Sequence, residues 1–339
     1  GSVFGLIIGG ALTSISWEWI FLINVPIGIF IVIAGHYVLG AVEGQRVPLD
    51  IWGAILATLG STALVLGLTS AGKGASNPVF IVAMLVGIAS LGAFFITQKH
   101  TENGVLPLSL FTRRDRVFTF IAIFLLGAIM TTVAVFVALY VQTILKYTTL
   151  RAGLAFIPFA FALALGAATA SKISMKWAPR WIILAGCIFM VIGFGWGTAI
   201  SEESTFWADI FPPTLIIGYG VGLVSIALTL SAVAGVKPID VGPLTAISLV
   251  AQTLGGPIGL AFAGALAQSY TRHHGGADIP VTEMNSVQLH ALGEGYLLTL
   301  FVCLGLAVVM GILSALFIRF TVPDVVEGQK ANEAANDLP

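Results

Sequence analysis

Residues 117–142 read VFTFIAIFLLGAIMTTVAVFVALYVQ, a long apolar stretch without one charged side chain. A bilayer core about 30 Å thick is crossed by about 20 predominantly apolar residues in a helix, so this stretch is long enough to span a membrane. The same criterion predicts eight further spans, at 20–40, 50–70, 78–97, 152–171, 181–200, 210–234, 242–269 and 296–318. The sequence therefore predicts an all-α polytopic membrane protein with about nine transmembrane helices, preceded by a shorter apolar piece over 1–13.

The composition excludes several classes of protein. Of the 339 residues, 58% are hydrophobic and 9% are charged, whereas soluble domains carry about 25% charged residues. Lys and Arg number 15 against 16 Asp and Glu, which leaves no basic excess for binding nucleic acid. Cys187 and Cys303 both lie in apolar runs, so neither a disulfide framework nor a cysteine metal site is predicted.

The loop charges predict the orientation. Eleven Lys and Arg residues fall in one alternating set of loops and the C-terminal tail, and four fall in the other set. Short cytoplasmic loops collect Lys and Arg, so the first set and the tail are expected in the cytoplasm of a plasma-membrane protein. The polar tail over 321–339 is expected to be disordered.

Two connections are longer than turns. Residues 98–116 combine apolar side chains with the cluster Arg113-Arg114-Asp115-Arg116. Such a segment is suited to lying in the cytoplasmic headgroup layer of the membrane. The alternative is an ordinary loop that joins two helix bundles, and the two interpretations are compatible. Residues 270–295 are expected to form an external loop, with a short helix near Met284–Leu292.

No predicted span carries an Asp, Glu, Lys or Arg near its middle, and intramembrane ionisable groups usually mark proton or ion pathways. If transport is coupled to protons, the coupling carboxylate therefore lies outside this chain.

No catalytic arrangement of side chains is predicted from the sequence either. His273 and His274 have no third ligand nearby, which argues against a metal site. The stretch from Gly67 to Gly74 lacks the hydroxyl residue of a phosphate-binding loop and follows a membrane helix, so no nucleotide site is predicted.

Glycines recur at short spacing inside the spans. Gly193, Gly195 and Gly197 form one group, and 218–222 reads GYGVG. Because a missing side chain lets neighbouring helices approach closely, these groups predict tight helix contacts or helix bends.

The start of the chain resembles a known family. Gly1, Gly5, Gly9 and Gly10, followed by WEWIFLINVPIG over 17–28, are similar to the antiporter glycine motif of the major facilitator superfamily and the run that follows it. Leu6 stands where that motif usually has proline. Later segments agree in family order: FVALYVQ over 136–142, LRAGLAFIP over 150–158, LTLSAVAG over 228–235, and GPLTAIS and QTLGGP between 242 and 257. Together they resemble the fourteen-helix drug:proton antiporter branch, and in particular its QacA- and EfpA-like efflux pumps.

The resemblance implies a major facilitator fold that is incomplete in this chain, as in an N-terminally truncated fragment. Residues 1–40 would hold the end of the N-terminal bundle, with part of helix five and helix six. Residues 41–97 would hold an inserted central helix pair, 98–116 a cytoplasmic interfacial linker, 117–320 a six-helix C-terminal bundle, and 321–339 the tail.

The same resemblance implies a substrate cavity between the two bundles, opened alternately to either side. Its candidate lining residues are Phe136, Tyr140, Gln142, Phe159, Tyr219 and Gln252. Aromatic faces and neutral amides suit lipophilic, often cationic, small molecules. Lys172, Lys176 and Arg180 resemble a degenerate basic loop motif that would latch the bundles on the cytoplasmic side, or they anchor the loop by charge alone.

The expected function is proton-driven efflux of multiple drugs or lipophilic compounds, without a cofactor other than the proton gradient. The expected partners are the lipid bilayer, a lipophilic small-molecule substrate and, for a truncated chain, a separate N-terminal half; the fragment alone is expected to be inactive. Two alternatives stay open: export of a lipid or endogenous metabolite, and a non-transporting remnant or scaffold.

Overall fold

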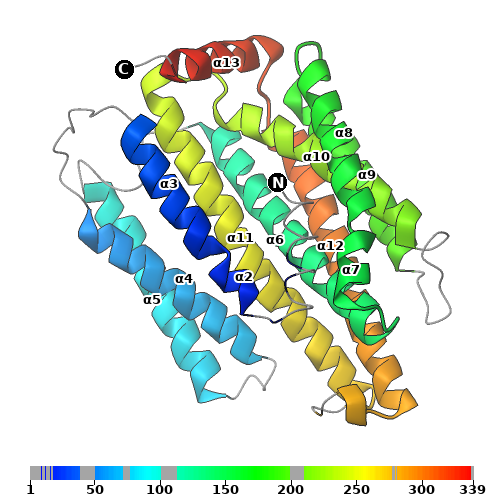
Figure 1. The fold of residues 1–339 in the computed structure, drawn as a ribbon. Helices are drawn as coiled ribbons and strands as arrows, with labels where there is room; N and C mark the ends of the chain where they lie inside the picture. Colours follow the sequence, from blue (N-terminus) through cyan, green and yellow to red (C-terminus); the bar gives the residue numbers. More distant parts are fainter. Residues whose placement is uncertain are drawn as a thin grey trace.

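The computed structural model describes residues 9, 12, 16, 18–38, 50–71, 77–100, 113–198, 210–276, 279 and 281–336. Every regular element within these ranges is helical (Figure 1). Eight described helical segments, one of them the stretch Thr149–Ile173, are long and apolar enough to cross a membrane. The predicted all-α polytopic membrane architecture is therefore confirmed, whereas the span predicted at 20–40 is described only as two shorter helices.

The helices have the following bounds: α2 Trp19–Leu22, α3 Asn24–Val38, α4 Ile51–Ala71, α5 Pro78–His100, α6 Arg114–Thr143, α7 Thr149–Ala155, α8 Ile157–Ile173, α9 Pro179–Gly197, α10 Phe211–Ala232, α11 Pro238–His273, the 3-10 turn Val281–Glu283, α12 Ser286–Phe317 and α13 Val322–Asn336. Four successive helices, α8 to α11, carry a proline in their first turn. Proline suits this position because its missing N–H would have no intrahelical partner there. Most of the predicted linker over 98–116 lies outside the described residues; its two ends belong to α5 and α6.

Helices α6 and α8 to α12 pack into one bundle. Helix α10 lies against α8 and α9, and α6 lies against α11 and α12. The fully buried side chains of Leu126, Met190, Phe194, Leu244 and Met310 belong to its core. Helices α4 and α5 form a separate pair, and α4 rests on α11 beside the bundle (Figure 1).

Glycines bring the backbones of the bundle helices into direct contact, as the sequence predicts for 218–222. A Cβ atom on Gly222 would collide with the carbonyl oxygen of Leu163 and lie 2.7 Å from the backbone nitrogen of Ala167, both on α8. A Cβ atom on Gly220 would lie 2.6 Å from the carbonyl oxygen of Gly186 on α9. Gly195 has only a side-chain carbon within reach, at 3.9 Å, so its position does not require glycine.

The loop predicted over 270–295 is much shorter in the structure. Helix α11 continues to His273, and α12 begins at Ser286. Asn285 and Gln288 form a capping box, with side-chain-to-backbone hydrogen bonds of 2.8 and 2.9 Å. This cap satisfies N–H groups at the start of α12 and thereby extends the helix beyond the apolar stretch that the sequence marks.

The tail is helical rather than disordered over its described part, which corrects the prediction for 321–339. Val325, Gly328 and Ala331 recur every third residue on α13 and are buried against the bundle. The tail's polar composition led to the prediction of disorder. Three small or apolar residues on one face are enough to dock this short helix, because they meet a fixed partner surface.

Helix α13 is fastened to the turn between α10 and α11. The N–H of Gly235 donates to the carbonyl oxygen of Asp324 at 2.9 Å. Gly235 has a φ of +62°, a left-handed conformation that favours glycine. The carboxylate of Asp324 accepts hydrogen bonds from the backbone N–H and the hydroxyl of Thr321, at 2.8 and 2.7 Å. These bonds, with the backbone bond contributing most, hold the pKa of Asp324 below its usual value.

Gly328 lies at the contact between α13 and the end of α10. A Cβ atom on Gly328 would collide with the carbonyl oxygen of Val233, so we expect Gly328→Val to lift α13 from the bundle. An overpacking cost of about 1–3 kcal/mol corresponds to roughly 5- to 150-fold faster cleavage by trypsin after Lys330, measured by mass spectrometry of the released peptide. Gly305→Val is the matched control, because a Cβ atom at Gly305 meets nothing within 4 Å. Equal cleavage rates in the two variants would show that α13 is not held at this contact.

Candidate functional site: a cavity between α6, α11 and α12

A cavity of about 790 Å³ opens where α6, α11 and α12 diverge toward the α11–α12 loop. We call it the α6–α11–α12 cavity. Helix α4 closes one side with Val65 and Thr69, and the loop contributes Ile279, Val281 and Met284. The remaining lining residues are Val135, Phe136, Pro257, Leu260, Ala261, Gly264, Ala265, Ala267, Gln268, Thr271, Arg272, Gly276, Leu292 and Tyr296.

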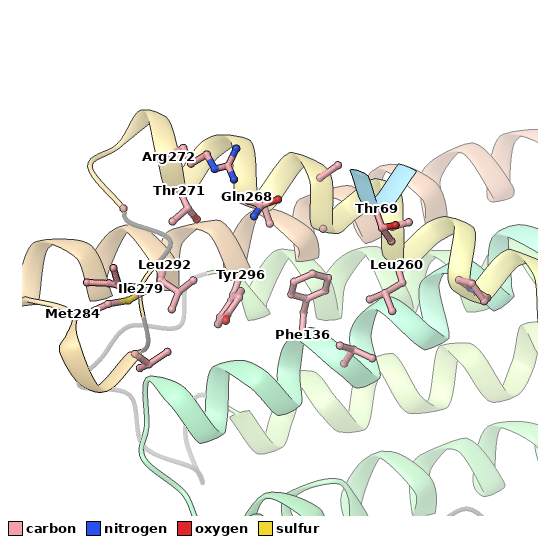
Figure 2. Close-up of a pocket in the computed structure, with 18 of the residues that line it drawn as sticks. Thr69, Phe136, Leu260, Gln268, Thr271, Arg272, Ile279, Met284, Leu292 and Tyr296 are labelled. Atoms are coloured by element: carbon pink, nitrogen blue, oxygen red, sulfur yellow. The ribbon is translucent and has the colours of Figure 1, made fainter. Parts of the chain in front are cut away.

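Two aromatic rings stand in this cavity. Phe136 on α6 and Tyr296 on α12 have ring centroids 5.7 Å apart and an interplanar angle of 55°. Figure 2 shows both rings in the space between α6 and α11. The ring faces offer a surface for stacking and dispersion contacts with a lipophilic molecule.

The polar lining residues come mainly from the last turns of α11. Gln268 and Arg272 are four residues apart, which places them on one face of the helix. The hydroxyl of Thr271 donates to the carbonyl oxygen of Ala291 at 3.3 Å and so ties α11 to α12. Figure 2 shows the three side chains on adjoining turns of α11. The cavity therefore combines an apolar, aromatic interior with a few polar groups near one end.

Phe136 is the one sequence-predicted cavity residue that lines this cavity. Tyr140, one turn further along α6, instead lines a small neighbouring void of about 30 Å³. The amide of Gln142 donates back to the carbonyl oxygen of Ala138 at 3.2 Å. The predicted roles of all three residues in substrate binding stay predictions.

The other three candidates lie elsewhere in the bundle. Tyr219 on α10 packs edge-on against Phe189 of α9, with ring centroids 5.1 Å apart. Phe159 on α8 is half-buried against the bundle core. At Gln252 on α11, the backbone carbonyl oxygen faces Gly127 of α6. The structure thus does not bring these residues together with Phe136, and their proposed contact with substrate stays a prediction.

Sequence reasoning missed Tyr296, Gln268 and Arg272. It placed Arg272 in an external loop and Tyr296 at the first residue of a span. For Tyr296, the signal that could have found it is the pair Asn285 and Gln288, an N-cap residue followed three positions later by a glutamine. This pair predicts the earlier start of α12 and therefore an ordered wall around Tyr296.

The other predicted groups are described in part. Gly9 is described, and a Cβ atom added to it would meet no described atom within 4 Å, whereas Gly1, Gly5 and Gly10 of the glycine motif lie outside the described residues. Lys172, in the last turn of α8, and Lys176, in the turn before α9, are exposed. The guanidinium of Arg180 lies 5.1 Å from the ring centroid of Trp181. The latch role of this basic loop stays a prediction.

Arg116 is a buried cation at the end of α6 that lies away from the α6–α11–α12 cavity. Arg116 is 5% exposed, and its guanidinium donates to the carbonyl oxygen of Ala234 at 3.2 Å. Its position in the sequence predicts that Arg116 is one of the charged residues of the cytoplasmic loops. The structure shows that it joins the start of α6 to the α10–α11 turn, which α13 also contacts.

Residues 1–260 match the family model described as Major Facilitator Superfamily, so the chain belongs to this superfamily of membrane transporters. The superfamily comprises transporters rather than enzymes. The resemblance seen in the sequence is thereby confirmed.

Individual relatives agree with this assignment. The MFS-type transporter EfpA of Mycobacterium tuberculosis is 40% identical over 98% of this chain, which spans 63% of EfpA. The cephamycin export protein CmcT of Amycolatopsis lactamdurans is 31% identical over 77% of this chain and 55% of its own length. The multidrug export protein EmrB of Haemophilus influenzae is 29% identical over 76% of this chain and 51% of its own length. These relatives fit the drug:proton antiporter branch.

A solved structure supports the fold alone. A bacterial homologue of the human lysosomal transporter Spinster, in an inward-facing conformation, superposes with a TM-score of 0.52. It is 16% identical and covers 81% of this chain and 67% of its own.

Proposed function

We propose that the protein exports lipophilic small molecules across the cell membrane by alternating access, driven by inward proton movement. The observation that carries this proposal is the α6–α11–α12 cavity. Its volume of about 790 Å³ falls within the range of roughly 300–1,000 Å³ typical of small-molecule sites. Its predominantly apolar lining with a few polar groups is also typical of such sites. The drug-export names of several relatives support the same substrate class.

The packing of the bundle suits a rigid-body mechanism. Backbone contacts at glycines join α8 to α10 and α6 to α11, so these helices would move as one unit. Alternating access in such transporters is largely the rocking of one helix bundle against another. The C-terminal bundle would therefore act as one rocking body, with α13 fastened to its cytoplasmic end.

We further propose that the coupling carboxylate lies in another part of the protein. The described spans carry acidic residues only in their outer turns: Asp115 in the first turn of α6, Asp240 in the first turn of α11 and Glu294 in the third turn of α12. A proton pathway through a membrane usually needs an ionisable group inside the span. Residues 1–339 alone are therefore expected to lack antiport activity.

The test uses the whole protein in proteoliposomes with an imposed pH gradient. Transport of Nile red, ethidium and anilinonaphthalene sulfonate, as neutral, cationic and anionic dyes, is followed by fluorescence. We expect at least one dye to move against its concentration gradient and to stop when nigericin collapses the pH gradient. Transport of none of them, or transport that nigericin leaves unchanged, would contradict proton-driven export.

A further inference from the structure

The connection between α8 and α9 carries both cations and exposed apolar side chains. We call it the basic–aromatic turn, and its members are Lys172, Met175, Lys176, Trp177, Arg180 and Trp181. Met175, Trp177 and Trp181 are each more than half exposed. The turn lies at the same end of the bundle as α13, the end that the loop charges predict to face the cytoplasm (Figure 1). Tryptophan is typical of the membrane–water interface, where its ring sits at the level of the lipid headgroups.

Hydrogen bonds within the turn fix its backbone. The N–H groups of Lys176 and Trp177 both donate to the carbonyl oxygen of Ile173 at 2.9 Å. The hydroxyl of Ser174 donates to the carbonyl oxygen of Ser171 at 2.8 Å. The backbone positions from which the cations and rings project are therefore set before any ligand arrives, which lowers the cost of binding.

Arg180 is oriented by a neighbouring ring. Its guanidinium lies 5.1 Å from the ring centroid of Trp181, within the range of a cation–π contact. The Nε atom of Arg180 is buried and has no hydrogen-bond partner among the described residues. A buried donor without an acceptor is costly, so the described protein leaves this guanidinium short of acceptors. Phosphate oxygens are acceptors that match the guanidinium fork.

No described acidic residue balances the cations of the turn. Lys172, Lys176 and Arg180 form no salt bridge with a described residue. Helices α8 and α9 pack on α7, α10 and α12. Of these three helices, α7 and α10 contain no acidic residue, and Glu294 of α12 lies in its third turn, toward the opposite end. The described chain runs without a break from 113 to 198, so the turn presents positive charge beside apolar rings.

We infer that the basic–aromatic turn binds an anionic phospholipid of the cytoplasmic leaflet. The lipid phosphate meets Arg180 and Lys176, and the glycerol and upper acyl region lies against Trp177 and Trp181. The exposed rings select a lipid over a free phosphate ion, which would leave them without contact. The inference goes beyond the proposed function and does not depend on it, because the turn lies outside the α6–α11–α12 cavity.

The test measures lipid contact at the turn itself. The whole protein is placed in nanodiscs of phosphatidylcholine that contain an equal small fraction of photoactivatable phosphatidylglycerol or photoactivatable phosphatidylcholine. Each probe carries a diazirine near the glycerol end of one acyl chain, and labels on Met175, Trp177 and Trp181 are quantified by mass spectrometry. We expect about fivefold more labelling by phosphatidylglycerol, the gain that one basic residue near a membrane surface gives to an anionic lipid. Equal labelling by the two probes would overturn the inference.

Variants separate this site from the general positive charge at the same end of the bundle. Lys176→Gln combined with Arg180→Gln should abolish the preference for phosphatidylglycerol, whereas Lys176→Arg combined with Arg180→Lys should keep most of it. Lys237→Gln is the matched control, because Lys237 is an exposed cation of the α10–α11 turn at the same end. A preference that survives the double glutamine variant, or that Lys237→Gln lowers equally, would overturn the inference. Labels are read only from protein that elutes as a monodisperse peak, so a misfolded variant is not counted.

Inorganic phosphate distinguishes a lipid site from a site for a free anion. The labelling is repeated with phosphate and with chloride at equal ionic strength. We expect the preference for phosphatidylglycerol to be the same in both, because free phosphate makes no contact with Trp177 and Trp181. A preference that phosphate abolishes and chloride does not would assign the turn to free phosphate and contradict a lipid site.

Discussion

Gly222→Val is expected to prevent the bundle from reaching its native packing. The new Cβ atom would collide with the carbonyl oxygen of Leu163 and lie 3.0 Å from the Cα atom of Gly166, both backbone atoms of α8. A side chain can rotate away from such a contact, but two helix backbones must separate. We expect a loss of about 3 kcal/mol or more, at the upper end of overpacking costs. The corresponding fall in Tm is at least roughly 6 °C.

The measurement is the thermal stability of the detergent-solubilised protein, followed by the loss of the monodisperse peak in size-exclusion chromatography. Gly127→Val tests the second backbone contact, where the Cβ atom would meet the carbonyl group of Gln252 on α11. Gly305→Val introduces the same side chain at an open position and should leave the Tm within about 1 °C. If Gly222→Val behaves like Gly305→Val, the helices α8 and α10 do not pack as described.

Removal of either aromatic ring of the α6–α11–α12 cavity is expected to weaken ligand binding about tenfold. Tyr296→Ala and Phe136→Leu each remove ring contacts, and an aromatic contact contributes about 0.5–1.5 kcal/mol beyond its buried area. Leucine is chosen at Phe136 because this ring is 8% exposed and also packs in the bundle, so alanine would leave a cavity. Binding of dansyl-aminoundecanoate methyl ester, a neutral lipophilic probe, to the whole protein in nanodiscs is measured by dansyl fluorescence.

Two control variants sharpen this prediction. Tyr296→Phe keeps the ring and removes only the hydroxyl, so it should bind the ester almost as well as the native protein. Phe118→Ala removes a ring that stacks on Phe317 at 3.9 Å near the α13 end of the bundle, outside the cavity. Its binding should equal that of the native protein. Equal losses in Phe118→Ala and Tyr296→Ala would mean that the effect is one of folding and not of ligand contact.

The sequence predicts the described spans well and their ends poorly. Apolar length alone locates α6, because a segment without charges must be buried in lipid or in protein. It does not locate the start of α12, which is set by the hydrogen bonds of Asn285 and Gln288 outside the apolar stretch. It also misses α13, whose stability depends on a surface formed by the α10–α11 turn.

The candidate site was predictable only in part. As an aromatic residue on a span, Phe136 is predicted to suit a lipophilic ligand, and the structure places it in the cavity. The same reason applies to Tyr219, yet it packs against Phe189 on the neighbouring helix. Residue type does not say which face of a helix meets a void. That depends on helix rotation and on close contacts such as the one at Gly127, which appear only when the helices are assembled.

The most direct test of the central claim is to map where a transported ligand lies. A diazirine derivative of the neutral dansyl ester is photo-crosslinked to the whole protein in nanodiscs, and the labelled residues are identified by mass spectrometry. The account predicts labels on α6 around Phe136 and on α12 around Tyr296, and their loss when unlabelled probe competes. Competed labels confined to α8 and α10 around Phe159 and Tyr219 would contradict it and place the ligand among the other residues that the sequence suggests.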